Sequence, residues 1–290
     1  MEAADIIVGS TERLCDISPK PDITFHGPNL IDCSTIEQVY CNRVLNENIK
    51  GYEPIRKNKQ IVFVAKHENN KPELQKIPDN YDPVRILWTG SSTHEEDLKQ
   101  IIDPVLYLGK RYGMAIRFIF FGYCPTEFLK VYIEHGNTNQ QLVIRDEYSH
   151  FIDYIEAVKF PQYYKVLESL CPDFSLCPLS PVVFNLAKSN IKVLELGAMG
   201  IPSIVSDYGP YKFIADNQDG LKVQVMNKSG WIQAIELLIN SVNDRQRLGS
   251  NIRERVFNDF SWNHDSENRR KWDIIFNEIH RLVQIRKDED

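Results

Sequence analysis

Short apolar segments alternate with segments of helical periodicity from residue 84 onward, and this alternation constrains the fold more than any other feature. The expected strands are residues 84–90, 114–122, 141–146, 174–179, 202–207 and 221–225. Helices are expected between them, including residues 126–136 and 164–170, and three more close the chain. Leu98, Ile101, Ile102, Val105 and Leu108 share one face of the first helix. Such alternation predicts βαβ units and a parallel, doubly wound α/β sheet, which is a Rossmann-like fold.

The chain before residue 83 has a different pattern. Residues 4–10, 23–26 and 61–67 are apolar enough for strands, and residues 11–17 predict a brief helix. The rest of residues 33–82 is polar and contains prolines, which is typical of an irregular linking region. We therefore place one α/β domain at residues 83–262 and a C-terminal helix at residues 263–290.

The bulk composition excludes several classes of protein. A net charge of −6 gives no global attraction to nucleic acid or to an anionic membrane. No apolar run approaches the roughly 20 residues of a membrane span, and the N-terminus does not have the pattern of a secretory signal. Six cysteines occur without CxxC spacing, which favours reduced thiols. We expect a cytoplasmic protein, either dissolved or peripheral to the membrane.

The first candidate loop, TGSSTHEE, follows the strand at residues 84–90. In open α/β sheets, ligands bind beyond the carboxyl ends of the strands. Gly90 permits a tight turn there, and Ser91 and Ser92 offer hydroxyls at a helix start, where free N–H groups favour a phosphate. A capping box from Ser92 to Glu95 explains the same residues without a ligand. No GxGxxG fingerprint is present.

A metal site is a weaker alternative at this loop. His94 and Asp97 are spaced so that both could reach one ion, but an exposed helix start explains them equally well. The candidate loops carry no DxD-type acidic cluster. We therefore expect no metal site and no cofactor.

The second candidate segment is FNLAKSNIKVLE. If a helix begins near Lys188 or Ser189, then Lys188, Lys192 and Glu195 lie on one face of it. Lys188, Ser189 and the helix start would hold a diphosphate, and Glu195 would accept hydrogen bonds from the two hydroxyls of a ribose. A surface ion pair between Lys192 and Glu195 is an equally good interpretation of the pattern. A third turn, with Ser206 and Gly209 in SDYGPY, either flanks the ligand or simply joins a strand to a helix.

The order AKSNIKVLELGAMGIPSIVSDYGPY resembles the nucleotide-sugar-binding half of B-type-fold (GT-B) glycosyltransferases, especially the retaining family 4 enzymes of polysaccharide and O-antigen synthesis. That family has a Glu-x7-Glu motif followed by A-x-G-x-P-V-I-x-S, and Glu195 matches the second glutamate. The likeness covers residues 4–32 and 84–262. It implies that residues 1–32 are a strand-helix remnant of an N-terminal domain and its linker.

Two positions depart from the family pattern. Ala187 stands where the family has its first glutamate, so Asn185 and Lys188 are the candidates to contact the transferred sugar. The family's basic pair after the first strand has no match, so Lys188 and Lys192 would supply that charge. The resemblance also implies that the loop at residues 159–165 contacts the donor's base.

The resemblance implies a retaining, metal-independent sugar transfer from a nucleotide sugar to a polysaccharide or other glycan acceptor, with Lys188 and Glu195 as catalytic residues. Asn185, Ser189 and Lys192 would help to bind the donor. One alternative is a non-catalytic nucleotide-sugar-binding or assembly subunit of a split transferase, which docks on a separate acceptor-binding domain or subunit. Another, less favoured, is a nucleotide-sugar epimerase. The final helix carries an apolar stripe that fits either docking or its own core: Trp272, Ile275, Phe276, Ile279, Leu282 and Val283.

Overall fold

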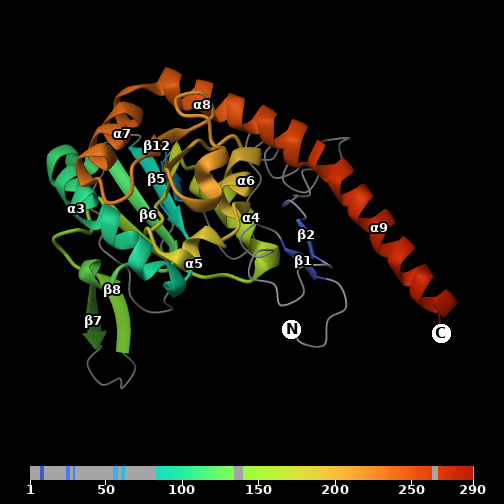
Figure 1. The fold of residues 1–290 in the computed structure, drawn as a ribbon. Helices are drawn as coiled ribbons and strands as arrows, with labels where there is room; N and C mark the ends of the chain where they lie inside the picture. Colours follow the sequence, from blue (N-terminus) through green and yellow to red (C-terminus); the bar gives the residue numbers. More distant parts are fainter. Residues whose placement is uncertain are drawn as a thin grey trace. The chain divides into compact units, whose positions relative to one another are not determined.

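The computed structural model describes residues 7–9, 24–26, 29, 55–57, 60–62, 83–133, 140–262 and 267–289 (Figure 1). The chain divides into two compact units. One comprises Gln38–Pro178 and Met226–Arg245, and the other comprises Met1–Glu37, Leu179–Val225 and Gln246–Asp290. The predicted domain boundaries at residues 32, 82 and 262 remain a proposal.

A parallel sheet lies in the unit that contains residues 83–178. Its strands are β5 (Val84–Thr89), β6 (Ile116–Gly122), β9 (Ile152–Glu156) and β10 (Phe174–Cys177). They pair in the order β10-β5-β6-β9, and every pair is parallel. Because parallel strands need crossover connections, the helices α3 (Glu95–Tyr112) and α4 (Phe160–Leu170) return the chain across the sheet.

Helix α3 packs through the face that its sequence predicts. Leu98, Ile101, Val105 and Leu108 are fully buried, and each such side chain contributes roughly 1.5–3 kcal/mol of burial free energy. Helix α7 (Lys228–Asn240) lies against α3. Ion pairs join their exposed sides, and one of these brings Arg111 within 2.8 Å of a carboxylate oxygen on α7.

The helix predicted at residues 126–136 is wrong. Thr126–Phe128 forms one 3-10 turn, and the chain then enters β7 (Leu129–Ile133), which pairs antiparallel with β8 (Gln140–Ile144). The sequence LKVYI alternates and is rich in β-branched and aromatic residues, so strand formation is favoured over a helix. The pair forms a hairpin apart from the main sheet (Figure 1), and the sheet's next strand is β9, which the sequence did not predict.

The other unit contains β11 (Ser203–Ser206), which pairs parallel with β12 (Leu221–Val223). Two short helices, α5 (Val183–Leu186) and α6 (Ile191–Ala198), precede these strands, and a 3-10 turn at Gly209–Phe213 follows β11. Helix α8 (Val242–Arg255) continues into a π-helical turn at Val256–Phe260, and helix α9 (Glu267–Glu289) follows.

Helix α9 buries only part of its apolar stripe. Ile275 is 5% exposed, whereas Phe276 is 49% exposed. The stripe is therefore buried in part and exposed to solvent in part. The Trp272 and Phe276 rings lie 5.4 Å apart. Leu282 and Val283 belong to the helix, but their side chains lie outside the described part.

Short strand pairs are also described near the N-terminus. Strand β1 (Ile7–Gly9) pairs parallel with β2 (Thr24–His26), and β3 (Ile55–Lys57) pairs antiparallel with β4 (Gln60–Val62). Strands β1 and β2 fall inside segments predicted as strands, and β4 overlaps the start of the strand predicted at residues 61–67. The brief helix predicted at residues 11–17 lies outside the described residues.

In each unit taken by itself the strands of the sheet are parallel: β10-β5-β6-β9 in one and β11-β12 in the other. Parallel strands that alternate with helices along the chain are the pattern of a doubly wound α/β fold, so the predicted Rossmann-like fold class is confirmed. Among the described helices, none is long and apolar enough to cross a membrane. The described cysteines at 124, 171 and 177 are free, and burial raises the pKa of the Cys124 thiol.

Candidate functional site

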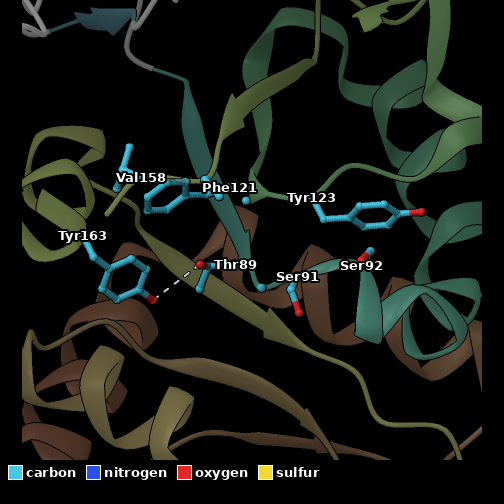
Figure 2. Close-up of a pocket in the computed structure, with 10 residues that line it drawn as sticks. Thr89, Ser91, Ser92, Phe121, Tyr123, Val158 and Tyr163 are labelled. Atoms are coloured by element: carbon cyan, nitrogen blue, oxygen red, sulfur yellow. Dashed lines mark hydrogen bonds between the residues drawn. The ribbon is translucent and has the colours of Figure 1, made fainter. Parts of the chain in front are cut away.

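A pocket of about 370 Å³ opens at the carboxyl ends of β5, β6 and β9 (Figure 2). Its walls come from the ends of these strands, the loops that follow them, and α4. The lining residues are Thr89, Gly90, Ser91, Ser92, Phe121, Gly122, Tyr123, Ala157, Val158 and Tyr163. Because ligands of open parallel sheets bind at this edge, the location is that of a binding site.

Two glycines hold the loops after β5 and β6 together at the pocket. The Gly90 N–H donates to the Phe121 carbonyl at 3.0 Å. Gly122 has φ +96°, and a Cβ there would overlap the Gly90 carbonyl oxygen. A side chain at 122 would therefore force the two loops apart, and glycine alone combines this backbone conformation with this close approach.

An aromatic wall forms one side of the pocket. The Tyr163 ring stacks on the Phe121 ring, with centroids 5.4 Å apart and planes at 18°. Its hydroxyl oxygen lies 3.4 Å from Thr89 Oγ1, and Figure 2 shows the two groups facing each other, with Val158 beside Phe121. The wall thus offers flat apolar surface with a polar edge, a surface suited to a planar ring.

The hydroxyl-bearing loop forms the opposite side. Ser91 and Ser92 are exposed, and Ser91 Oγ lies 2.8 Å from Thr93 Oγ1. The alternative explanation of these residues, a capping box from Ser92 to Glu95, does not hold, because α3 begins at Glu95 after a 3-10 turn and its N-cap, His94, makes no side-chain cap hydrogen bond. Burial, followed by the charge and hydrogen bond of Glu95, raises the pKa of the Tyr123 hydroxyl, which therefore stays protonated at neutral pH.

His94 and Asp97 form a pair beside the pocket loop. His94 Nδ1 lies 2.9 Å from Asp97 Oδ2, and Asp97 is 2% exposed. Within the described residues, no group of three or more histidine, cysteine or carboxylate side chains could hold a metal ion. The pair is therefore an ion-pair or hydrogen-bond element of the loop.

The second predicted segment lies in the other unit. Helix α5 ends at Leu186 and α6 begins at Ile191, so Lys188 and Ser189 lie in the link before α6 and not in the helix itself. Ser189 Oγ accepts from the Ile191 N–H at 3.1 Å and from Asn29 Nδ2 at 3.0 Å. The Lys188 ammonium lies 5.6 Å from the centre of the Phe184 ring, and this aromatic ring is itself exposed.

Lys192 and Glu195 remain on one face of α6, at i and i+3. Both are half-buried, and Glu195 stands between the fully buried Leu194 and Leu196.

The three other predicted residues of this unit support its backbone. Asn185, 2% exposed, donates from Nδ2 to the Ser180 carbonyl at 2.8 Å. Ser206, fully buried, accepts at Oγ from the Leu179 N–H at 2.8 Å. Gly209 has φ +56°, and a Cβ there would lie 2.6 Å from the Asn185 carbonyl oxygen. As donor-binding residues, all three remain predictions.

Sequence reasoning predicted Gly90, Ser91 and Ser92 of the pocket but missed most of its wall. Phe121 and Gly122 end strand β6 and Tyr123 follows it, and the signal available was a glycine at the end of an apolar strand. Val158 follows β9, a strand that was not predicted. Tyr163 was placed in the loop at residues 159–165, but it lies in the first turns of α4.

The sequence matches no protein-family model and no curated protein. Among solved structures, the chain is similar to Staphylococcus aureus TarM in complex with fondaparinux, alpha-GlcNAc-glycerol and UDP, with 15% identity and a TM-score of 0.55 over 95% of this chain and 44% of that one. Sucrose-phosphate synthase from Thermosynechococcus elongatus shares 14% identity, with a TM-score of 0.55 over 100% of this chain and 60% of the synthase.

Anabaena HepE in complex with UDP and glucose shares 8% identity, with a TM-score of 0.55 over 97% of this chain and 63% of that one. The chain thus spans less than two thirds of the length of each of these proteins. It has the fold of GT-B glycosyltransferases, as the resemblance in the sequence implied.

Proposed function

We propose that this chain binds a nucleotide sugar and transfers its sugar to a glycan acceptor, as the donor-binding half of a GT-B glycosyltransferase. The observation that carries the proposal is the pocket at the carboxyl ends of β5, β6 and β9, in a chain with that fold. TarM and HepE were each solved with UDP, which supports a nucleoside diphosphate as the ligand class.

The pocket's two sides match the two parts of such a ligand. The stacked rings of Phe121 and Tyr163, with Val158 beside them, offer a flat apolar surface to a base. Gly90, Ser91 and Ser92 offer backbone and hydroxyl groups to phosphate oxygens, and Gly90 allows the ligand to approach the backbone closely. We therefore assign the base to the side near α4 and the diphosphate to the side near the start of α3.

For the α6 segment, which belongs to the other unit, only the sequence resemblance supports contacts with a donor. Lys188, Ser189 and Lys192 would stabilise the charge that grows on the departing diphosphate, and loss of one such donor typically costs about 3 kcal/mol of barrier. Glu195 would accept hydrogen bonds from a ribose diol. Asn185, Ser206 and Gly209 would support this segment. The transfer would retain the anomeric configuration and need no metal.

A binding panel tests the proposal. The probes are UDP-glucose, UDP-GlcNAc, GDP-mannose, ADP-glucose and CMP-sialic acid, each measured by thermal shift with and without EDTA. A specific donor raises the apparent unfolding temperature by mass action, and EDTA does not remove the effect. If none of the five shifts the transition, the donor-binding function is wrong.

Turnover separates an enzyme from a binding module. With the sugar radiolabelled, slow hydrolysis or transfer supports a glycosyltransferase, whereas binding without release of sugar supports the non-catalytic subunit. Retention is read from the anomeric configuration of the product by NMR.

Lys188→Ala tests the role of the α6 segment. We expect turnover to fall by about a hundredfold while donor affinity falls less than tenfold, because the lysine charge is needed most when the diphosphate departs. Lys271→Ala, an exposed lysine on α9, is the matched control and should change neither. Equal losses of turnover and affinity would show a simple ground-state contact instead.

A further inference from the structure

We propose that His94, held by Asp97, supplies the positive charge that a donor's diphosphate meets at the pocket loop. The inference rests on the proposed function and adds a residue that the sequence resemblance does not assign. Its basis is the place of the pair in the fold: His94 ends the 3-10 turn that carries Ser92, and Asp97 lies in the first turn of α3.

The buried carboxylate fixes the orientation of the imidazole. Asp97 is almost completely buried, and its Oδ2 lies 2.9 Å from His94 Nδ1. An ionised carboxylate only accepts hydrogen bonds, so Nδ1 carries a hydrogen in this pair. When the ring is protonated, this carboxylate is the partner of its charge.

The other edge of the ring lies against the pocket loop. His94 Cδ2, the carbon bonded to Nε2, lies 3.3 Å from the position of a Cβ on Gly90, and Gly90 lines the pocket. The Trp88 ring meets the imidazole edge to face, with centroids 6.2 Å apart. The side chain is still 18% exposed, so the ring is wedged in place and in contact with solvent.

The charges around the loop explain why a positive charge on His94 would favour binding of a diphosphate. Between Thr89 and Leu98, His94 is the sole basic side chain, whereas Glu95, Glu96 and Asp97 are acidic. Glu96 is paired with Lys99 at 2.6 Å, and Glu95 interacts with the Tyr123 hydroxyl. A diphosphate at Ser91 and Ser92 would thus face carboxylates, and a protonated His94 offsets the buried one nearest the loop.

Calorimetric titration of the full chain between pH 5.5 and 8.5 tests the inference. The probes are UDP-glucose, GDP-mannose and ADP-glucose, whose diphosphate keeps a constant charge over this range, and the matching nucleosides without phosphate. For the nucleotide sugar that binds most tightly, we expect affinity to fall about tenfold as the pH rises. The nucleoside's affinity should not depend on pH.

His94→Gln should bind the nucleotide sugar about tenfold more weakly at pH 5.5 and should show no dependence on pH, while its nucleoside affinity is unchanged. His150→Gln is the matched control, because this histidine precedes β9 and lies at the opposite edge of the sheet. It should behave as the wild type does at every pH.

Asp97→Asn tests the positioning role. Because a neutral amide does not stabilise the imidazolium, the midpoint of the affinity curve should move to lower pH, which a merely structural contact would not cause. If this buried variant does not fold, His94→Gln decides alone. Wild-type binding whose pH dependence survives in His94→Gln overturns the inference and leaves the proposed function standing. Absence of any nucleotide-sugar binding by the wild type overturns both.

Discussion

The loop that follows β5 and the segment from Ser180 to Gly209 use their polar residues in opposite ways. In the first, Ser91 and Ser92 are exposed beside a pocket, and its form is set by glycine backbone and aromatic rings. In the second, Asn185 and Ser206 are buried and hold backbone groups. Polar residues in a motif therefore mark either ligand contacts or internal supports, and burial separates the two.

The largest expected effect is a loss of stability when a side chain is added at Gly122, beside the loop that follows β5. In Gly122→Ala, the new Cβ would overlap the Gly90 carbonyl in a left-handed backbone, so we expect a loss of about 2–4 kcal/mol of stability. Chemical denaturation measures it. The control is Gly113→Ala, which also has positive φ but meets nothing within 4 Å and should cost about 1 kcal/mol. Equal losses in the two variants would show that the close approach is unimportant.

The fold was predictable from the sequence where burial gives an element a clear periodicity, and it was not predictable elsewhere. Helix α3 and strands β5 and β6 were predicted closely because burial imposes clear periodicities on them. The hairpin β7–β8 was misread as a helix, since over a short segment apolar residues match both periods. Strand β9 has a mixed sequence, IDYIE, with a half-buried aspartate and tyrosine, and its neighbours rather than its composition make it a strand.

The parts of the site that follow from the order of strands and helices were predictable, and the parts that depend on tertiary contacts were not. Gly90, Ser91 and Ser92 stand in a loop whose position follows from sheet topology, so sequence order located them. Tyr163 and Phe121 are 42 residues apart in the chain, and only the parallel pairing of β6 with β9 brings their elements together. The burial of Asn185 and Ser206 depends on tertiary packing, which local sequence does not encode.

Ser206→Ala tests whether a buried polar residue of the segment from Ser180 to Gly209 is an internal support. Removing Oγ leaves the buried Leu179 N–H without its acceptor, so we expect a loss of about 1–3 kcal/mol of stability. Ser229→Ala, at an exposed position, should stay within about 0.5 kcal/mol of the wild type. Nucleotide-sugar affinity per folded molecule should change less than twofold. A larger loss would give Ser206 the direct contact that its sequence motif predicts.

Glu195→Ala tests whether this region nevertheless contacts the donor. We expect nucleotide-sugar affinity to fall about tenfold, roughly 1.4 kcal/mol, because a charged acceptor for the ribose hydroxyls is lost. Isothermal titration measures it, and circular dichroism checks the fold. Glu254→Ala, an exposed glutamate on α8, is the control and should leave the affinity unchanged. Full affinity in a folded Glu195→Ala protein would confine donor binding to the first region.

The smallest effect is expected at the aromatic wall. The hydroxyl of Tyr163 lies 3.4 Å from Thr89 Oγ1, near the limit of a hydrogen bond, so Tyr163→Phe should cost less than about 0.5 kcal/mol of stability. The ring and its stacking on Phe121 remain, so nucleoside affinity should stay within about twofold of the wild type. Tyr163→Leu keeps apolar volume but removes the flat surface, and it should weaken the nucleoside several-fold. If Phe and Leu at this position bind the nucleoside equally well, the base does not lie on this wall, and the pocket's division into a base side and a phosphate side fails.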